Sequence, residues 1–434
     1  MNYAMRIKLL AAALGVSVLA AACGGGAAQE DTASPTSESP QVVEETEADT
    51  SDDMATEETA EATPAVDTPA ATLTRDLTSL LASHEHLAGI AVLTAVQAGG
   101  DLEDPTFKAA AGALDANSVD LSEAVAGVYG DAGGKQFLDL WRAHIGFFVD
   151  YTLGKATDDK QMVTKAEKNL DGYRSDFGAF IDGATEGGLP KAAVEEALLP
   201  HVNMTKSAID SVVAGDGKAF DKLFGAATHL SGVATALSGA IVEQQGIEGS
   251  ADDGAAQLQR DLTSLLVSHE FLAGDAVLTA VQAGGDLEDP TFKAAAAALD
   301  KDSVALSEAV ASVYGDAGGK QFLDLWRAHI GFFVDYTLGK ATDDKQMVTK
   351  AEKALDGYRS DFGAFIDGAT EGGLPKAAVE EALLPHVNMT KSAIDSVVAG
   401  DGKAFDKLYG AATHLSGVAT ALSGAIVGQF PDKF

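Results

Sequence analysis

The stretch LWRAHIGFFVDYT at residues 140–152 occurs a second time, letter for letter, at residues 325–337. The offset is 185 positions (325 minus 140), and the same offset relates RDLTSLL at 75–81 to RDLTSLL at 260–266. Such a long-period repeat indicates a tandem duplication of one folded unit. We therefore expect two domains joined by a polar, Gly-containing linker. The expected boundaries are 73–245 for copy one, 246–256 for the linker and 257–434 for copy two.

Both copies carry the pattern of amphipathic helices. Apolar residues recur three and four positions apart, alanine and leucine are abundant, and clusters of Gly or Pro interrupt the pattern. A weaker internal repeat indicates that each copy consists of three helical hairpins. The sequence therefore predicts an all-α fold of two tandem six-helix bundles. The helices expected in copy one span 74–97, 105–129, 132–155, 159–183, 189–213 and 217–242.

The first residues have the features of an export signal. Arg6 and Lys8 precede an apolar run from Leu9 to Ala22, which is shorter than the roughly 20 residues of a membrane span. Small residues then lead to Cys23, the only cysteine of the chain. This segment resembles the signal of bacterial lipoproteins. An ordinary secretory signal followed by a chance cysteine is the alternative.

The lipoprotein resemblance implies processing and location. Residues 1–22 would be removed as the signal peptide, and Cys23 would be lipidated on sulfur and acylated on its new amino group, for example with palmitate. The secreted protein would then be lipid-anchored at the extracytoplasmic face of the cell membrane. Because no second cysteine is present, an intramolecular disulfide is excluded, and stability must come from packing or from metal.

The chain is strongly acidic, with 65 Asp and Glu against 30 Lys and Arg and a formal net charge of -35. This charge disfavours nucleic acid as a partner, since phosphate binding requires positive charge. Residues 23–72 are rich in Glu, Asp, Thr, Ser, Pro and Ala and contain no Lys or Arg. Their composition predicts a disordered acidic tether between the lipid and copy one.

Signatures of catalysis are missing from the sequence. It contains no His-Glu-x-x-His zinc motif, no Gly-x-Ser-x-Gly nucleophile turn and no Gly-rich phosphate loop after a strand. The two repeated domains also lack a thiol nucleophile. We therefore expect a protein that is not an enzyme.

Histidines recur at fixed places in both copies. Four per copy fall on the apolar stripes of four different expected helices, so their side chains are predicted to point inward. Inward histidines from separate helices are how bundles build metal and haem sites. A single inward histidine is more often a hydrogen-bonded core residue, and inheritance from one ancestral hairpin is a rival explanation. The pairs are His84 and His269, His144 and His329, His201 and His386, and His229 and His414.

Copper is the favoured cofactor, ahead of other transition metals and of haem. Met204 lies three residues after His201, and Met389 has the same place in copy two, a nitrogen and thioether pairing that suits copper. A core-filling role for the methionines is the alternative. Glu85 and Glu270 adjoin the first histidine of each copy but point off the apolar stripe, which makes them weak ligand candidates.

Positions that differ between the copies are poor candidates for a shared site. Copy two replaces His86 by Phe271 and Asp120 by Ala305. His86 lies two positions from His84 and is predicted to point away from the stripe. Neither His86 nor Asp120 is therefore expected to be a ligand in both copies.

Three longer motifs suggest a family. FLDLWRAHIGFFVDYT at 137–152, LDGYRSDFGAFIDGATEGGLP at 170–190 and the ending LSGAIVGQFPDKF at 422–434 are similar to helical modules of secreted Gram-positive proteins labelled copper amine oxidase-like. The resemblance covers nearly all of each copy. It implies export and a helical architecture, and it identifies no reaction.

The sequence thus favours a non-catalytic envelope lipoprotein whose helical domains bind a transition metal, or less favourably haem, through inward histidines. Expected partners are the membrane, through the lipid anchor, the metal ion, and an unidentified envelope or extracellular protein. The competing hypothesis is a structural or adhesive surface module in which the histidines are ordinary core residues without a ligand.

Overall fold

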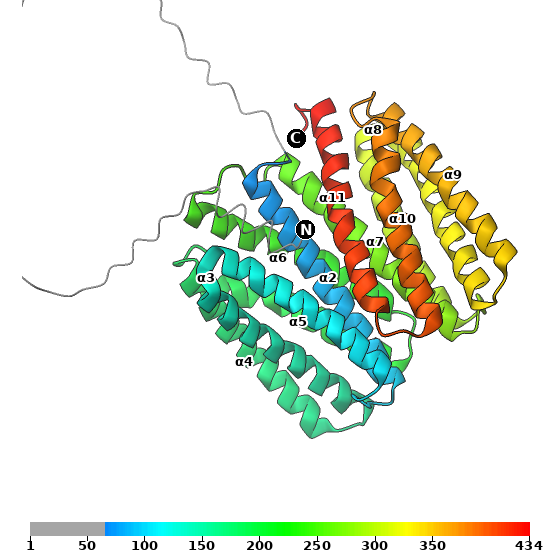
Figure 1. Ribbon diagram of the computed structural model, residues 1–434. Coiled ribbons are helices and arrows are strands. Elements are labelled where there is room, and N and C mark those ends of the chain that lie inside the picture. The colour runs from blue at the N-terminus through cyan, green and yellow to red at the C-terminus, as the bar shows by residue number, and fades with distance from the viewer. Residues whose placement is uncertain (1–65) are drawn as a thin grey trace, which may run out of the picture. The chain divides into compact units, whose positions relative to one another are not determined.

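The computed structural model describes residues 66–434, and this part of the chain is all helical, with no strand (Figure 1). The all-α prediction is confirmed for these residues, whereas the expected signal, Cys23 and most of the expected tether lie outside them. The helices of copy one are α2 (Pro69–Gln97), α3 (Pro105–Ala156), α4 (Lys160–Ala184), α5 (Lys191–Ala214) and α6 (Ala219–Gln245). Those of copy two are α7 (Gly254–Gln282), α8 (Pro290–Ala341), α9 (Lys345–Ala369), α10 (Lys376–Ala399) and α11 (Ala404–Gln429).

The first helix begins earlier than its apolar pattern indicates, at Pro69 instead of residue 74. The Thr68 hydroxyl accepts a hydrogen bond from the Ala71 N–H at 3.1 Å, and Pro69 lies in the first turn, where its missing N–H is not needed. The Ala70 N–H donates to the carbonyl of Glu248 at 3.1 Å. The end of the expected tether and part of the expected linker therefore contact each other within the fold.

Two predicted helices, 105–129 and 132–155, are the two halves of α3. Gly130 separates them with φ 77° and ψ 171°, a conformation that a side chain would oppose. The Ser122 hydroxyl donates to the Gly134 carbonyl at 3.0 Å. In a straight helix these residues would be about 18 Å apart, so the chain folds back at Gly130. Each copy thus contains six helical segments, as predicted.

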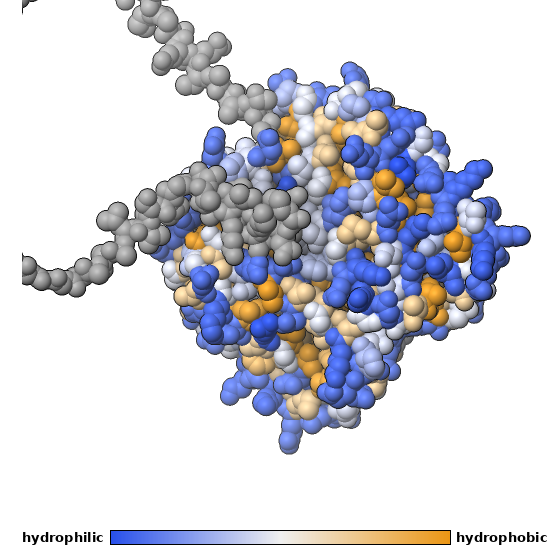
Figure 2. Space-filling model, viewed as in Figure 1, coloured by the Kyte–Doolittle hydropathy of each residue, from blue (hydrophilic) through white to orange (hydrophobic). Residues whose placement is uncertain are grey.

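Four helices at the centre of the fold, α2, α6, α7 and α11, have unusually apolar sequences. Among the described helices, α2, α6, α7 and α11 are long and apolar enough to cross a membrane, judged by length and composition alone. In this structure α2 packs on α6 and α7, and α7 packs on α11, so much of their apolar surface is covered by protein (Figure 1). On the face in Figure 2, apolar residues are scattered among hydrophilic ones. Burial among the central helices accounts for the apolar sequences of α2 and α7.

Helix α2 is buried on all sides rather than along one stripe. It contacts α3, α5 and α6 of its own copy and α7 and α11 of copy two. As a result 22 of its 29 residues are buried, including charged and polar ones. The prediction that only the stripe containing His84 points inward is therefore too narrow, because a helix enclosed by neighbours has no solvent face.

The two copies meet through α2 and α7, which run parallel and in register. Gln97 and Gln282, one offset apart, exchange two side-chain hydrogen bonds of 3.0 and 2.9 Å. Eleven residues earlier, the rings of His86 and Phe271, again one offset apart, stack with centroids 5.3 Å apart. Equivalent residues that touch at both places define a pseudo-two-fold arrangement, as in a symmetric dimer.

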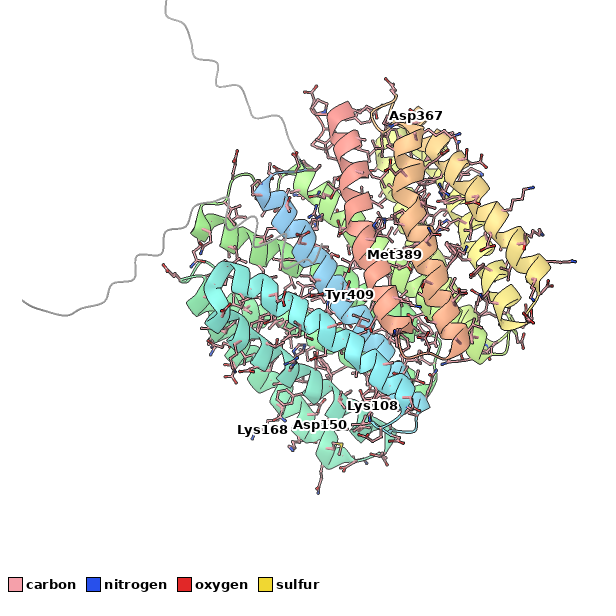
Figure 3. The ribbon with its side chains drawn as sticks, viewed as in Figure 1. Lys108, Asp150, Lys168, Asp367, Met389 and Tyr409 are labelled. Atoms are coloured by element: carbon pink, nitrogen blue, oxygen red, sulfur yellow. The ribbon has the colours of Figure 1, made fainter. Side chains whose placement is uncertain are left out.

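Several residues that differ between the copies lie at this interface. The Tyr409 hydroxyl donates to Asp120 Oδ2 at 2.8 Å, whereas the equivalent residues of the other half are Phe224 and Ala305. Figure 3 marks Tyr409 on α11, a helix that contacts both α2 and α3. The Lys301 ammonium pairs with Asp221. The interface has therefore diverged into two unlike, complementary halves.

The Tyr409–Asp120 pair tests this interface by a double-mutant cycle. Tyr409→Phe and Asp120→Ala each install the residue found at the equivalent position, and the double variant recreates the apolar pair of the other half. We expect the two changes to couple by about 1 kcal/mol in the free energy of unfolding, since the hydrogen bond is lost only once. Urea unfolding of the four proteins measures this. Strictly additive effects would contradict the interface.

The burial of a carboxyl in α7 is also testable. Asp275 is 4% exposed and is the counterpart in copy two of Ile90. Burial raises the pKa of its carboxyl to about 8. A raised folded-state pKa means that stability is lost as pH rises from about 4 toward 8, by up to about 1.4 kcal/mol per pH unit. We expect Asp275→Ile to stabilise the protein, and by more at pH 8 than at pH 5. Equal gains at both pH values, from urea unfolding, would refute the burial of this carboxyl.

Candidate metal centre

Three of the predicted histidines converge in the core of copy one. His84 comes from α2, His144 from α3 and His201 from α5, and their exposed fractions are 2%, 1% and 5%. One ring nitrogen from each lies within 4.8 Å of the other two. The Nε2 atoms of His84 and His144 are 3.3 Å apart. Three imidazoles from three helices thus meet at one point.

Copy two has His269, His329 and His386 at the equivalent positions. The Nε2 atoms of His269 and His329 are again 3.3 Å apart, and their ring centroids are 5.3 Å apart, as in copy one. His386 is buried. It lines one cavity together with His269 and His329, and a second cavity together with His329. Copy two therefore has a similar histidine cluster, although among the described residues only the three histidines of copy one bring their ring nitrogens within 4.8 Å of one another.

Burial keeps these imidazoles neutral. It lowers the pKa of His84 to about 3 and that of His201 to about 4, with smaller contributions from neighbouring histidines. Burial, together with His84 and His201, lowers the pKa of His144 well below its usual value. A neutral imidazole offers a free lone pair, which is the form that binds a metal ion.

Glu85 belongs to the site, contrary to the prediction that it points off the stripe. Its side chain is fully buried, and its Oε2 lies 3.5 Å from His201 Nδ1. The Thr205 hydroxyl, one helical turn after His201, donates to the carboxyl at 3.1 Å. Burial raises the pKa of Glu85 to about 8. Glu270 makes the equivalent contacts with His386 and Thr390.

Aromatic rings surround the cluster. The Trp141 ring lies 4.7 Å from that of His84 and 4.6 Å from that of His144, measured between centroids. Tyr173 stacks on His144 at 4.7 Å, and Phe148 lies edge-on to His201. This wall limits access of water to the imidazoles, which strengthens electrostatic interactions at the site.

Two cavities flank the histidines of copy one. One of about 30 Å³ touches all three histidines and Glu85, and one of about 70 Å³ touches His144 and His201. The larger one extends to Tyr129 and Thr185. Spaces of this size accommodate an ion or a few atoms, but a porphyrin would require the helices to separate. The geometry therefore favours a metal ion over haem.

The fourth predicted histidine has a different partner. His229 on α6 is half-buried, and its Nε2 donates to the carbonyl of Ala197 at 3.2 Å. His414 donates to the Ala382 carbonyl in the same way, at 3.1 Å. Neither belongs to the group of three nitrogens described above, so the structure brings together three of the four histidines predicted in copy one.

The methionines are packed against small residues. Met204 is half-buried on α5, and its Cε lies 3.7 Å from the position that a Cβ would occupy on Gly225 of α6. Met389, marked on α10 in Figure 3, lies against Gly410 in the same manner. These contacts match the core-filling alternative for both methionines.

His86, expected to lie away from the stripe, is buried at the interface between the copies. Its Nε2 lies 3.0 Å from the Ser268 hydroxyl, and its ring stacks on Phe271. Phe271 is the equivalent residue of copy two, and the two positions face each other across the interface. At this contact His86 is hydrogen-bonded to Ser268, and Phe271 packs against the His86 ring.

Comparisons with protein-family models, with curated proteins and with solved structures found no match.

Proposed function

We propose that the protein binds a transition-metal ion at a centre of three histidines in each copy, without catalysing a reaction. The observation that carries the proposal is the convergence of His84, His144 and His201, whose neutral nitrogens face one another within 4.8 Å. Imidazole suits zinc, copper, nickel and iron, and copper(II) binds most tightly of these by the general affinity order. Three protein nitrogens leave a fourth position open for water or a small ligand.

The other histidines of the fold provide an internal comparison. His229 is bonded to a backbone carbonyl and His86 to a hydroxyl, as expected of ordinary core histidines. In contrast, His84 and His144 direct their Nε2 atoms at each other. A cation shared by these nitrogens explains why they are turned toward one another.

Glu85 supports the same reading through its charge. A cation at the three imidazoles would be buried, and burial of an uncompensated charge is unfavourable. The Glu85 carboxyl contacts His201 and, because burial favours its uncharged form in the metal-free protein, would supply the compensating negative charge by losing its proton when the cation binds. Carboxylate partners of this kind orient ligating histidines and raise their basicity.

The proposed location follows from the sequence alone. The lipoprotein-like segment at Cys23 would hold the two copies at the extracytoplasmic face of the membrane, where the long acidic segment would act as a spacer. A metal-binding lipoprotein in this place would buffer or capture ions outside the cell. The structural or adhesive hypothesis predicts the same tether without bound metal.

Metal stoichiometry tests the proposal. The full chain, loaded with Cu²⁺ and freed of excess metal by gel filtration, should retain two ions per chain by elemental analysis. His144→Ala and His329→Ala should each lower this to one, and the double variant to none. His229→Ala is the matched control and should retain two. Retention of less than about 0.2 ions by the unaltered chain, or equal retention by all variants, would refute the proposal.

Tryptophan fluorescence provides an independent readout. The chain has two tryptophans, and Trp141 and Trp326 each lie beside one cluster. Paramagnetic Cu²⁺ at both centres should quench most of the emission. In His144→Ala the Trp141 emission should persist while that of Trp326 is still quenched. Emission that does not change at two equivalents of Cu²⁺ would argue for the structural alternative.

A further inference from the structure

The two histidine clusters differ at one neighbouring position. Asn117 in the first half of α3 corresponds to Asp302 in the first half of α8, and both are fully buried. In copy two, Asp302 Oδ2 lies 3.7 Å from His269 Nδ1, the ring nitrogen opposite the one that faces His329. Copy two therefore has a carboxyl beside its cluster, where the equivalent residue of copy one is an amide.

Asn117 is held by hydrogen bonds to its surroundings. Its Nδ2 donates to the Leu80 carbonyl at 3.0 Å and to the Tyr409 hydroxyl at 3.4 Å. Tyr409 in turn donates to Asp120. This network crosses the interface between the copies. It holds the Asn117 amide in place through its two N–H donors.

Asp302 has no comparable network. Neither of its carboxyl oxygens has a hydrogen-bond partner among the described residues, although the side chain is 0% exposed. The residue equivalent to Tyr409 is Phe224, which has no hydroxyl to offer. A buried carboxyl without a partner is unfavourable, so this position requires a compensating positive charge or donor.

A cation on His269 would supply both. With the metal on Nε2, the imidazole proton lies on Nδ1 and is directed to the neighbouring carboxylate, which orients the ring and increases its donor strength. The negative charge of Asp302 would also offset the charge of the buried cation. Asn117 cannot contribute a negative charge to the cluster of copy one.

We infer that the two centres are unequal, and that Asp302, acting through His269, makes the centre of copy two the tighter metal site. This inference rests on the proposed metal-binding function. The chain would then fill in order, copy two first and copy one at higher metal concentration. Two affinities in one chain extend the concentration range over which the protein holds metal.

Single-centre chains test the inference. His144→Ala leaves the centre of copy two, and His329→Ala leaves that of copy one, each in the full chain. Cu²⁺ titrations against a competing chelator should give a Kd roughly 10- to 100-fold lower for copy two, the range typical of such partners. Adding Asp302→Asn to the first chain should remove this advantage, and adding Asn117→Asp to the second should recover part of it.

The melting temperature of the metal-free chain separates a role toward metal from a purely structural one. Asp302→Asn removes a buried carboxyl that has no partner and should raise the melting temperature, while it weakens Cu²⁺ binding. A structural carboxyl would change melting without changing the Kd. The opposite signs of the two effects also show that weaker binding does not result from unfolding.

The outcomes distinguish this inference from the function on which it rests. If neither single-centre chain binds Cu²⁺, the proposed function is wrong and the inference with it. If both bind with equal Kd, or Asp302→Asn leaves the Kd of copy two unchanged, only the inference is overturned. A tighter copy-two centre that Asp302→Asn weakens supports it.

Discussion

The burial of α2 on all sides is the constraint on which the rest of the structure depends. Its three consecutive residues His84, Glu85 and His86 point in three directions, and none reaches solvent. The first meets His144, the second meets Thr205 and His201, and the third meets copy two. Because buried polar groups require partners, each direction needs a complementary group on a different helix. Site and interface are therefore built on one turn of one helix.

Much of the fold follows from local patterns. Apolar spacing and Gly or Pro clusters predict the helices, and the offset of 185 residues predicts two equivalent halves. Helix phase also identifies His144 and His201 as inward, because α3 and α5 each cover the core with one face, and it places His84 inward on a helix that is buried on every side. Met204, selected by its spacing from His201, instead lies against Gly225, since spacing along a helix does not specify which neighbour a side chain meets.

Other features depend on packing that local patterns do not encode. The helix phase predicts an outward Glu85, and this prediction is wrong because α2 has no outward face. A signal was nevertheless present, since residues 69–97 contain only three charged residues and a helix apolar all round is a buried helix. Asp120 and Tyr409 lie 289 residues apart in the sequence, so their pairing becomes visible only when the copies are brought together.

Several differences between the copies lie at one place and have a common effect. Substitutions at positions 86, 117, 120 and 224 and their counterparts lie at or beside the interface, where they turn a symmetric contact into two unlike halves. Asn117 is hydrogen-bonded across the interface to Tyr409, whereas its counterpart Asp302 lies 3.7 Å from His269 Nδ1, so the same divergence makes the environments of the two clusters different.

The central claim is that three imidazoles in each copy share one metal ion. X-ray absorption spectroscopy of the zinc-loaded full chain tests it most directly, because the scattering pattern of histidine rings is distinctive. A shared ion requires three imidazole nitrogens per zinc at roughly 2.0–2.1 Å. A shell made only of oxygen ligands, or zinc that is lost during gel filtration, would contradict it.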